Sequence, residues 1–284
     1  MKKIQLLLLL LSSLSCFAQD LVLIDTIKLK CSYDYQYLLD TTSTSNKKYS
    51  SADILHLQIG SKYSKCFSYR TYQVDSINAY GDLSEFINNK ILEAESKGKS
   101  YKEAFKTTVP RYGMTAKVYK NYPEGKTTIT ESIVLDYYQY EDDLNLQNWD
   151  LQGDSIRSIL GYSCQKATCT FRGREWTAWF ALDIPISDGP WKFSGLPGLI
   201  MEAYDKGYQH WFRINGLQQV QNEPLYFGTD GKDISTFQKV KRTDLLKLQL
   251  DYFKDPYHYS EMSTGISLGQ GPRFERKRDL LERE

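Results

Sequence analysis

Apolar and polar residues alternate along much of this chain, and a period of two is typical of β-strands with one buried face. The clearest case runs from Ile27 to Tyr37, where an apolar or aromatic side chain occupies every second position. A shorter alternation covers Leu55 to Ile59. Between these runs, residues 41–51 are rich in Ser, Thr, Asn and Lys, which predicts a loop.

Further pairs of β-rich runs, each pair separated by a short turn sequence, predict two hairpins. The first turn is Pro123–Lys126 and the second is Arg172–Arg174. The strands beside these turns, together with two later β-like runs, cover residues 117–122, 127–134, 165–171, 176–181, 199–204 and 211–214.

A helical period interrupts the β pattern between these strands. Asp82, with Glu85 three residues later, is typical of a helix N-terminus. The apolar residues between Leu83 and Ala94 then fall on one face of a helix. This spacing predicts a helical segment near residues 83–106 whose apolar face packs on the sheet.

Together these elements predict an α+β fold, a large twisted antiparallel β-sheet, open and half-barrel-like, with one helical segment packed on it. The antiparallel domain spans residues 19–228. Residues 229–284 predict an irregular or helical C-terminal extension, with a short helix over 245–253. Its last part, residues 273–284, mixes acidic and basic residues and predicts a solvated tail or short helix.

Residues 1–18 have the organisation of a signal peptide. Lys2 and Lys3 precede an apolar run that is about half as long as a membrane-spanning helix requires, and Ala18 offers a small residue for cleavage. We therefore expect export to the periplasm, the cell surface or the medium, and no integral membrane protein. Cys16 leaves a lipid anchor as an alternative, although Ser13 stands where a lipobox has a branched apolar residue.

The charge balance then narrows the classes of partner. The chain of 284 residues carries 36 basic and 35 acidic side chains, so it lacks the basic excess of nucleic-acid-binding proteins. A hydrophobic content of 41% also separates it from disordered chains. We expect no nucleic-acid partner.

The cysteines that follow the signal peptide are Cys31, Cys66, Cys164 and Cys169. An even number in an exported chain predicts disulfides. Cys31 with Cys66 is the favoured pair, because residues 164 and 169 would face opposite sides of one regular strand. There is no Cys-x-x-Cys spacing and the three His lie far apart in sequence, so we expect neither a metal site nor a cofactor.

Signatures of catalysis are weak. The chain has no Gly-x-Ser-x-Gly and no His-Glu-x-x-His sequence. Four acids lie close together in sequence, and they leave a carboxylate-dependent hydrolase as an alternative function: Asp183, Asp188, Glu202 and Asp205. We assign no catalytic residue, and the sequence favours a protein that is not an enzyme without deciding the question.

The most distinctive segment runs from Ile159 to Ile200 and ends in Gly195-Leu196-Pro197-Gly198-Leu199-Ile200. This hexapeptide resembles the signature of the GLPGLI family, whose members are exported proteins typical of Bacteroidetes. The resemblance extends over roughly residues 20–225. It implies export and implies no chemistry, because the family has no assigned activity.

The hexapeptide also predicts a structural corner. Pro197 and Gly198 at the two central positions favour a type II turn, in which the glycine has a positive φ. Leu199 and Ile200 then begin a buried strand, while Trp191 and Phe193 cap the core.

A ligand site built from the same segment is the functional alternative. Its candidate residues are Arg172, Arg174, Trp176, Trp179, Trp191 and Phe193. Alternation places Trp176 and Trp179 on opposite faces, so the aromatic rings do not all share one cavity.

Three functions follow from this reading. By fold-level analogy with periplasmic lipoprotein-carrier half-barrels, the leading hypothesis is a non-catalytic module that binds a hydrophobic or glycan ligand or a partner protein. The hydrolase is the second. A structural envelope protein that docks through a sheet edge is the third.

Overall fold

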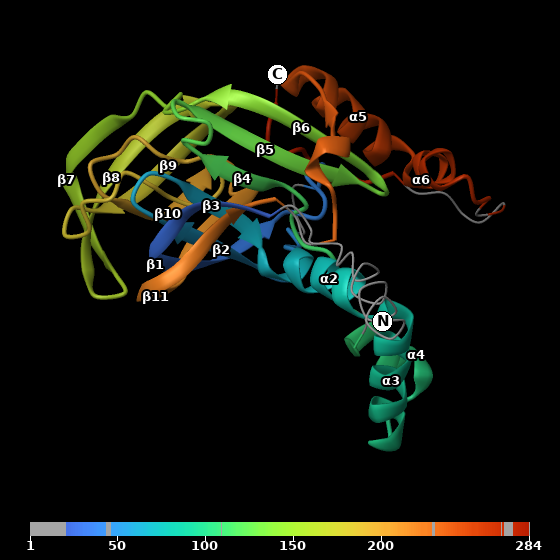
Figure 1. The fold of residues 1–284 in the computed structure, drawn as a ribbon. Coiled ribbons are helices and arrows are strands. Elements are labelled where there is room, and N and C mark those ends of the chain that lie inside the picture. The colour runs from blue at the N-terminus through green and yellow to red at the C-terminus, as the bar shows by residue number, and fades with distance from the viewer. Residues whose placement is uncertain are drawn as a thin grey trace, which may run out of the picture.

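A computed structural model describes residues 21–43, 47–108, 110–228, 231–267, 269 and 275–283. The predicted signal peptide lies outside the described residues. Within them the chain forms one 12-stranded sheet in the order β12-β6-β5-β4-β3-β2-β1-β11-β10-β9-β8-β7 (Figure 1). The strands are β1 (Val22–Tyr37), β2 (Asp53–Ile59), β3 (Ser64–Ser68), β4 (Lys117–Lys120), β5 (Lys126–Ile133), β6 (Asp136–Asp143), β7 (Asp150–Ile159), β8 (Tyr162–Phe171), β9 (Arg174–Ala181), β10 (Leu199–Asp205), β11 (His210–Phe227) and β12 (Gln238–Lys239).

The predicted large antiparallel sheet is confirmed. Neighbouring strands pair antiparallel along the whole order except for the two-residue strand β12, which runs parallel to β6. Both predicted hairpins are present, as β4–β5 and β8–β9. The alternation along β1 is also present, since Ile27, Leu29, Cys31, Tyr33 and Tyr35 are buried and the residues between them are not.

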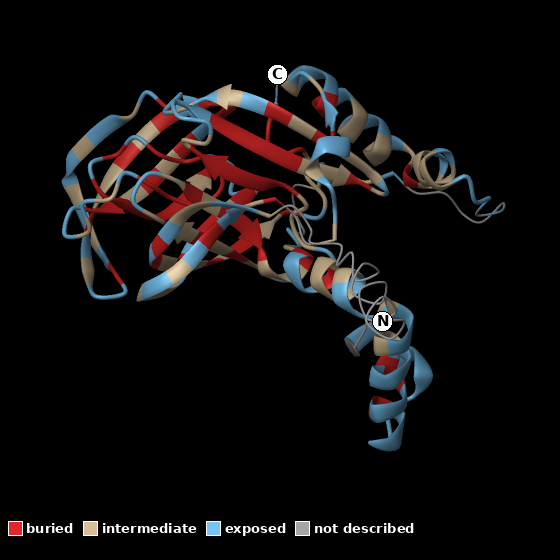
Figure 2. Ribbon diagram, in the orientation of Figure 1, coloured by how far each residue is buried: buried red, intermediate tan, exposed pale blue. Residues whose placement is uncertain are grey.

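The sheet curls into an open half-barrel with a shared interior. β6 and β8 stand nine positions apart in the strand order, which would separate them by roughly 43 Å in a flat sheet. Nevertheless Arg172, which directly follows β8, forms an ion pair of 2.8 Å with Asp142 near the end of β6. The two halves of the sheet therefore face each other, and Figure 2 shows buried residues along the strands between them.

Five α-helices accompany the sheet over the described residues: α2 (Tyr69–Tyr80), α3 (Leu83–Ser96), α4 (Tyr101–Thr108), α5 (Arg242–Lys254) and α6 (Pro256–Thr264). A short 3₁₀ turn, η1 (Ile234–Thr236), precedes β12. Helix α2, which the sequence analysis missed, contacts β2 and β3, and α5 contacts β6. None of the described helices is both long enough and apolar enough to cross a membrane.

The predicted start of α3 is confirmed, but its apolar face has a different neighbour. The Asp82 carboxylate accepts hydrogen bonds from the backbone N–H groups of Ser84 and Glu85. Ile91 and Ala94 then pack with Ala104 of α4 in a small cluster separate from the main core. The α3–α4 pair therefore projects away from the sheet as a helical arm (Figure 1) instead of packing on it.

The predicted disulfides are wrong, because Cys31, Cys66, Cys164 and Cys169 are all free and buried. Cys31 and Cys66 each pair with Leu57 from opposite sides of β2. Two strand spacings place their Cα atoms roughly 10 Å apart, and a disulfide requires less than about 7 Å. The other two cysteines stand five residues apart on β8, roughly 17 Å along an extended strand.

Candidate functional site

The Gly-Leu-Pro-Gly-Leu-Ile hexapeptide packs tightly against the end of β9. Leu196, Leu199 and Ile200 are buried, and β10 begins at Leu199 as expected. The predicted type II turn is wrong, because the positive φ belongs to Gly195, at 88°, and not to Gly198. Gly198 is needed for space: a Cβ there would lie 2.1 Å from the carbonyl oxygen of Ala181.

Aromatic side chains from this segment fill the interior of the half-barrel. Trp176, Trp191 and Phe193 have at most 2% of their surface exposed. The ring centroid of Phe193 lies 4.8 Å from Trp176 and 5.1 Å from Trp191. These three candidate ligand residues therefore lie in packed core. Trp179 lies on the opposite face, where the guanidinium of Arg157 stacks 4.3 Å from its ring centroid.

A buried lysine fastens the loop that carries these aromatics. The Lys120 ammonium of β4 donates to the carbonyl oxygens of Phe193, at 2.9 Å, and Gly189, at 2.5 Å. It also forms an ion pair with Asp188. The loop between β9 and β10 is thus held to the inner face of the sheet by one side chain that satisfies several acceptors.

Residues 275–283, here called the inner segment, cross the interior without forming a helix or strand. This contradicts the prediction of a solvated tail for residues 273–284 over its described part. Leu280 and Glu282 are each only 7% exposed. The charged residues of this stretch are therefore partners of buried groups. The local sequence of charges does not reveal such distant partners.

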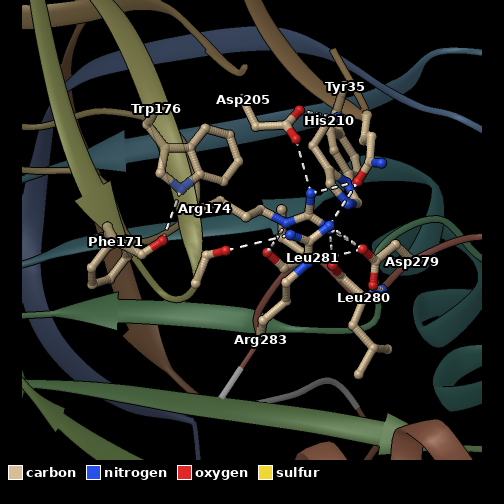
Figure 3. A network of polar contacts seen from close by, with 12 residues as sticks. Tyr35, Phe171, Arg174, Trp176, Asp205, His210, Asp279, Leu280, Leu281 and Arg283 are labelled. Carbon is tan, nitrogen blue, oxygen red and sulfur yellow. Dashed lines mark hydrogen bonds and ion pairs between the residues drawn. The ribbon is translucent and has the colours of Figure 1, made fainter. Parts of the chain in front are cut away.

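Arg174, at the start of β9, binds the main chain of the inner segment (Figure 3). Its Nε donates to the Leu281 carbonyl at 3.0 Å, and Nη2 donates to the preceding carbonyl, that of Leu280. Nη1 donates to Asp205 and Gln209, both at 2.8 Å. The rigid fork of donors on an arginine suits this simultaneous binding of two successive carbonyls and a carboxylate.

Glu282 of the inner segment lies in a cationic pocket. Its carboxylate is 2.5 Å from the ammonium of Lys192, 3.4 Å from Arg242 and 3.8 Å from Arg172. The Tyr140 hydroxyl also donates to it, at 3.2 Å. Buried carboxylates are stable only with such paired cations and donors, so the pocket is built for an acid.

Main-chain hydrogen bonds hold the inner segment at both ends. The Thr41 N–H and hydroxyl donate to the Lys277 carbonyl at 3.0 and 2.9 Å, and the Arg276 N–H donates to Phe253. At the other end the Arg283 N–H donates to the Arg172 carbonyl at 3.0 Å. Most of these contacts do not depend on which side chains the inner segment carries.

Two titratable groups border the inner segment. Burial, followed by the positive charge of Arg174, holds the pKa of His210 well below its usual value, so the ring is neutral; its Nδ1 lies 2.9 Å from the Tyr35 hydroxyl. Burial, followed by the negative charge of Glu282, raises the pKa of Glu131 to about 7. Glu131 accepts hydrogen bonds from Thr115 at 3.2 Å and Gln249 at 2.8 Å.

The acids that suggested a hydrolase do not converge on one cleft. Asp188 pairs with Lys120, and Asp205 pairs with Arg174. Glu202 pairs with Arg157 and accepts a hydrogen bond of 2.6 Å from the Trp211 indole. Glu202 and Asp205 stand three residues apart on β10 and face opposite sides of the sheet, while Asp183 is exposed.

The remaining surface features give no further assembled site. Over the described ranges no three His, Cys, Asp or Glu side chains are grouped to hold a metal ion. Two of the best-formed surface hollows are shallow, one between Tyr37 to Asp40 and the inner segment and the other between α2 and α3. The interior contacts of the inner segment therefore form the most elaborate polar site in the described structure.

Comparison with known proteins gives one family and a small set of solved structures. Residues 172–202 match the model of a family described as "Protein of unknown function (Porph_ging)". The curated proteins give no match. Solved chains titled "Structure of PNGF-II in C2 space group" and "Structure of PNGF-II in P21 space group" align with TM-scores of 0.47 and identities of 11% and 10%.

Each alignment covers 78% of this chain, and this chain spans 32% of the length of the solved chains. The family match covers the Arg172–Glu202 segment that carries the corner, its aromatics and the start of β10. Over that segment the chain is similar to a family of proteins of unknown function, in agreement with the GLPGLI resemblance of the same residues.

Proposed function

We propose that this protein is an exported, non-catalytic binding module that engages a partner protein through the inner face of the half-barrel. The observation that carries the proposal is the use of buried Arg174, 3% exposed, to bind two successive main-chain carbonyls. Every polypeptide carries main-chain carbonyls, so a site that binds them can accept a segment of a partner protein. The proposed export is supported by the signal-peptide pattern of residues 1–18.

A hydrophobic or glycan ligand has less support. The aromatic residues that would line its cavity are packed against one another, with Phe171 and Phe212 completing the cluster. A carboxylate-dependent hydrolase also has less support, because each of the three buried acids between residues 188 and 205 is paired with a different cation.

Docking through a sheet edge is the second candidate, and one observation favours it. β7 ends the strand order and exposes two large apolar side chains, Leu151 at 53% and Ile156 at 63%. Unpaired strand edges with apolar residues are templates for pairing with another chain. A register shift between Gln152 and Ile156 interrupts this edge, however, and irregularities of this kind hinder edge pairing.

A photo-crosslinking amino acid placed at three positions separates the candidates. Gln209 lies beside Arg174 and Arg283 on the inner face, Ile156 lies on the β7 edge, and Leu92 is exposed on the helical arm. The variants are expressed in the native host, irradiated and analysed by mass spectrometry of the crosslinked products.

The proposal expects protein adducts at Gln209 and none at Leu92. Adducts only at Ile156 would favour edge docking. Glycan or lipid adducts at Gln209, or no adduct there, would contradict partner binding on the inner face.

A further inference from the structure

We propose that the inner segment is a displaceable intramolecular ligand, and that the site beneath it binds a peptide from another protein with an apolar residue two positions before an acidic one. This inference rests on the proposed function and names its ligand class. It also gives the inner segment a regulatory role, because the partner peptide and residues 279–283 compete for the same contacts.

The main chain of residues 279–283 is held by contacts that another polypeptide could make. The carbonyls of Leu280 and Leu281 are both bound by one arginine, Arg174. No helix or strand includes residues 275–283, so the segment gains nothing from pairing within a regular element. A different polypeptide that follows the same bent path would satisfy the same donors.

Two side chains of the inner segment are positioned to select a ligand. Leu280 and Glu282 are its buried positions, and the neighbours of each are less buried. The acid meets Lys192, Arg242 and the Tyr140 hydroxyl. These contacts would select an apolar residue followed, after one intervening position, by a carboxylate.

The site beneath the inner segment is rich in cations. Removing the inner segment would leave Arg172, Arg174, Lys192 and Arg242 against only Asp142 and Asp205 among their ion-pair partners. Buried cations without partners are costly, so the site favours an anionic occupant over an empty state. Exchange of the inner segment for another peptide that carries an acid therefore costs less free energy than leaving the site empty.

Residues 276–278 are attached by aromatic contacts of their own. The guanidinium groups of Arg276 and Arg278 stack 4.6 Å from the ring centroids of Tyr252 and Tyr37, respectively. Arg278 also lies 4.7 Å from the Phe253 ring. These contacts are independent of the acid pocket, so residues 279–283 can leave while residues 276–278 remain stacked.

The test compares the full chain with Glu282→Lys and Glu275→Lys, two variants with the same charge change. Glu282 lies in the acid pocket, whereas Glu275 is exposed. Release is measured by thermolysin cleavage before Leu280 or Leu281, mapped by mass spectrometry. Binding is measured by fluorescence anisotropy with a labelled synthetic peptide of residues 279–283 and with a version carrying Glu282→Lys.

We expect Glu282→Lys to be cleaved faster in the inner segment and to bind the unchanged peptide at least tenfold more tightly than the other two proteins. The altered peptide should bind none of them. Should Glu282→Lys fail to fold, Leu280→Ala removes apolar contact without adding charge and should give the same order with a smaller, several-fold gain.

Two results would overturn the inference. Unchanged cleavage would make the inner segment a fixed part of the fold, and faster cleavage without tighter binding would show that the site does not accept the proposed peptide. Neither result alters the outcome expected from crosslinking at Gln209. The proposed function fails separately, when Gln209 captures no protein.

Discussion

The absence of a side chain fixes the corner at Gly198. The Ala181 carbonyl group occupies the space where a Cβ of residue 198 would lie. Its carbon and oxygen belong to the backbone, which cannot move aside as the end of a flexible side chain can. We expect Gly198→Ala to lower the free energy of unfolding by about 3 kcal/mol or more, measured by chemical denaturation. Gly153→Ala, where a Cβ meets nothing within 4 Å, is the matched control and should change it by less than about 0.5 kcal/mol. Equal stability of the two variants would contradict this account.

The thiols provide a second test at the scale of single residues. Burial raises the pKa of Cys66 to about 11 and the pKa of Cys31 and Cys169 to about 12, and burial also raises that of Cys164. Because the thiolate is the reactive form, iodoacetamide at pH 8 should label none of them in the native protein. After denaturation without reductant, all four should be labelled, as intact mass would show. Labelling that appears only after reduction would restore the disulfide hypothesis.

Glu131 makes stability depend on pH. Its pKa is about 7 in the folded protein against 4.5 ordinarily, so the folded state binds more protons than the unfolded state between these values. Stability should therefore fall as the pH rises from about 5 to 8, by on the order of 3 kcal/mol. Glu282 and Lys192 are the charged groups that act on it, with opposite signs.

Glu131→Gln should flatten this dependence, leaving stability similar at pH 5 and higher than wild type at pH 8. Urea unfolding across this range measures it, with Glu141→Gln, an exposed residue of β6, as the control. A variant that is less stable at pH 8 than wild type would be evidence against the raised pKa.

At the scale of elements, the helical arm stands apart from the sheet. Ile91, Ala94 and Ala104 form its own small cluster. Ile91→Ala should therefore increase hydrogen exchange throughout residues 83–108 while the amides of β1 and β2 keep their protection. Loss of protection in the sheet as well would mean that arm and sheet unfold together.

The helical arm also shows which features of a structure a sequence pattern can predict. The Asp82 cap predicted the first turn of α3, because a cap is a local arrangement of one side chain and nearby N–H groups. The apolar stripe predicted a buried face, but a stripe carries no information about what covers it. α2 gave neither signal clearly, since its cap residue Ser68 is also the last residue of β3 and only Thr71 and Val74 of the helix are buried.

At the scale of the whole molecule, the aromatic interior links the corner loop to the curled sheet. Trp191 is 2% exposed and contacts Phe171, Trp176, Phe193 and Phe212. Trp191→Ala should cost about 3–5 kcal/mol of stability, whereas Leu92→Ala on the exposed arm should cost little. Thermal and urea unfolding would measure both, and a stable Trp191→Ala would contradict the role of this ring as core.

Strands such as β1 and β2 could be predicted because their alternation records one buried face, whereas β3, β6 and β7 were missed. The candidate site could be predicted only in part. Arg172 and Arg174 stand out beside a turn, but their partners come from distant parts of the chain: Asp142 and Glu282 pair with Arg172, and Asp279 pairs with Arg174. The mixed charges around Leu280 resemble a solvated tail, since pairing across the interior leaves no local pattern.

The late position of the inner segment has a consequence for how the molecule matures. Its residues follow all 12 strands in sequence, so a chain that emerges N-terminus first builds its sheet before Glu282 arrives to neutralise Lys192. Until then Lys192 and Arg172 share the carboxylate of Asp142. The ion pairs of the interior are therefore complete only when the last residues of the inner segment take their place.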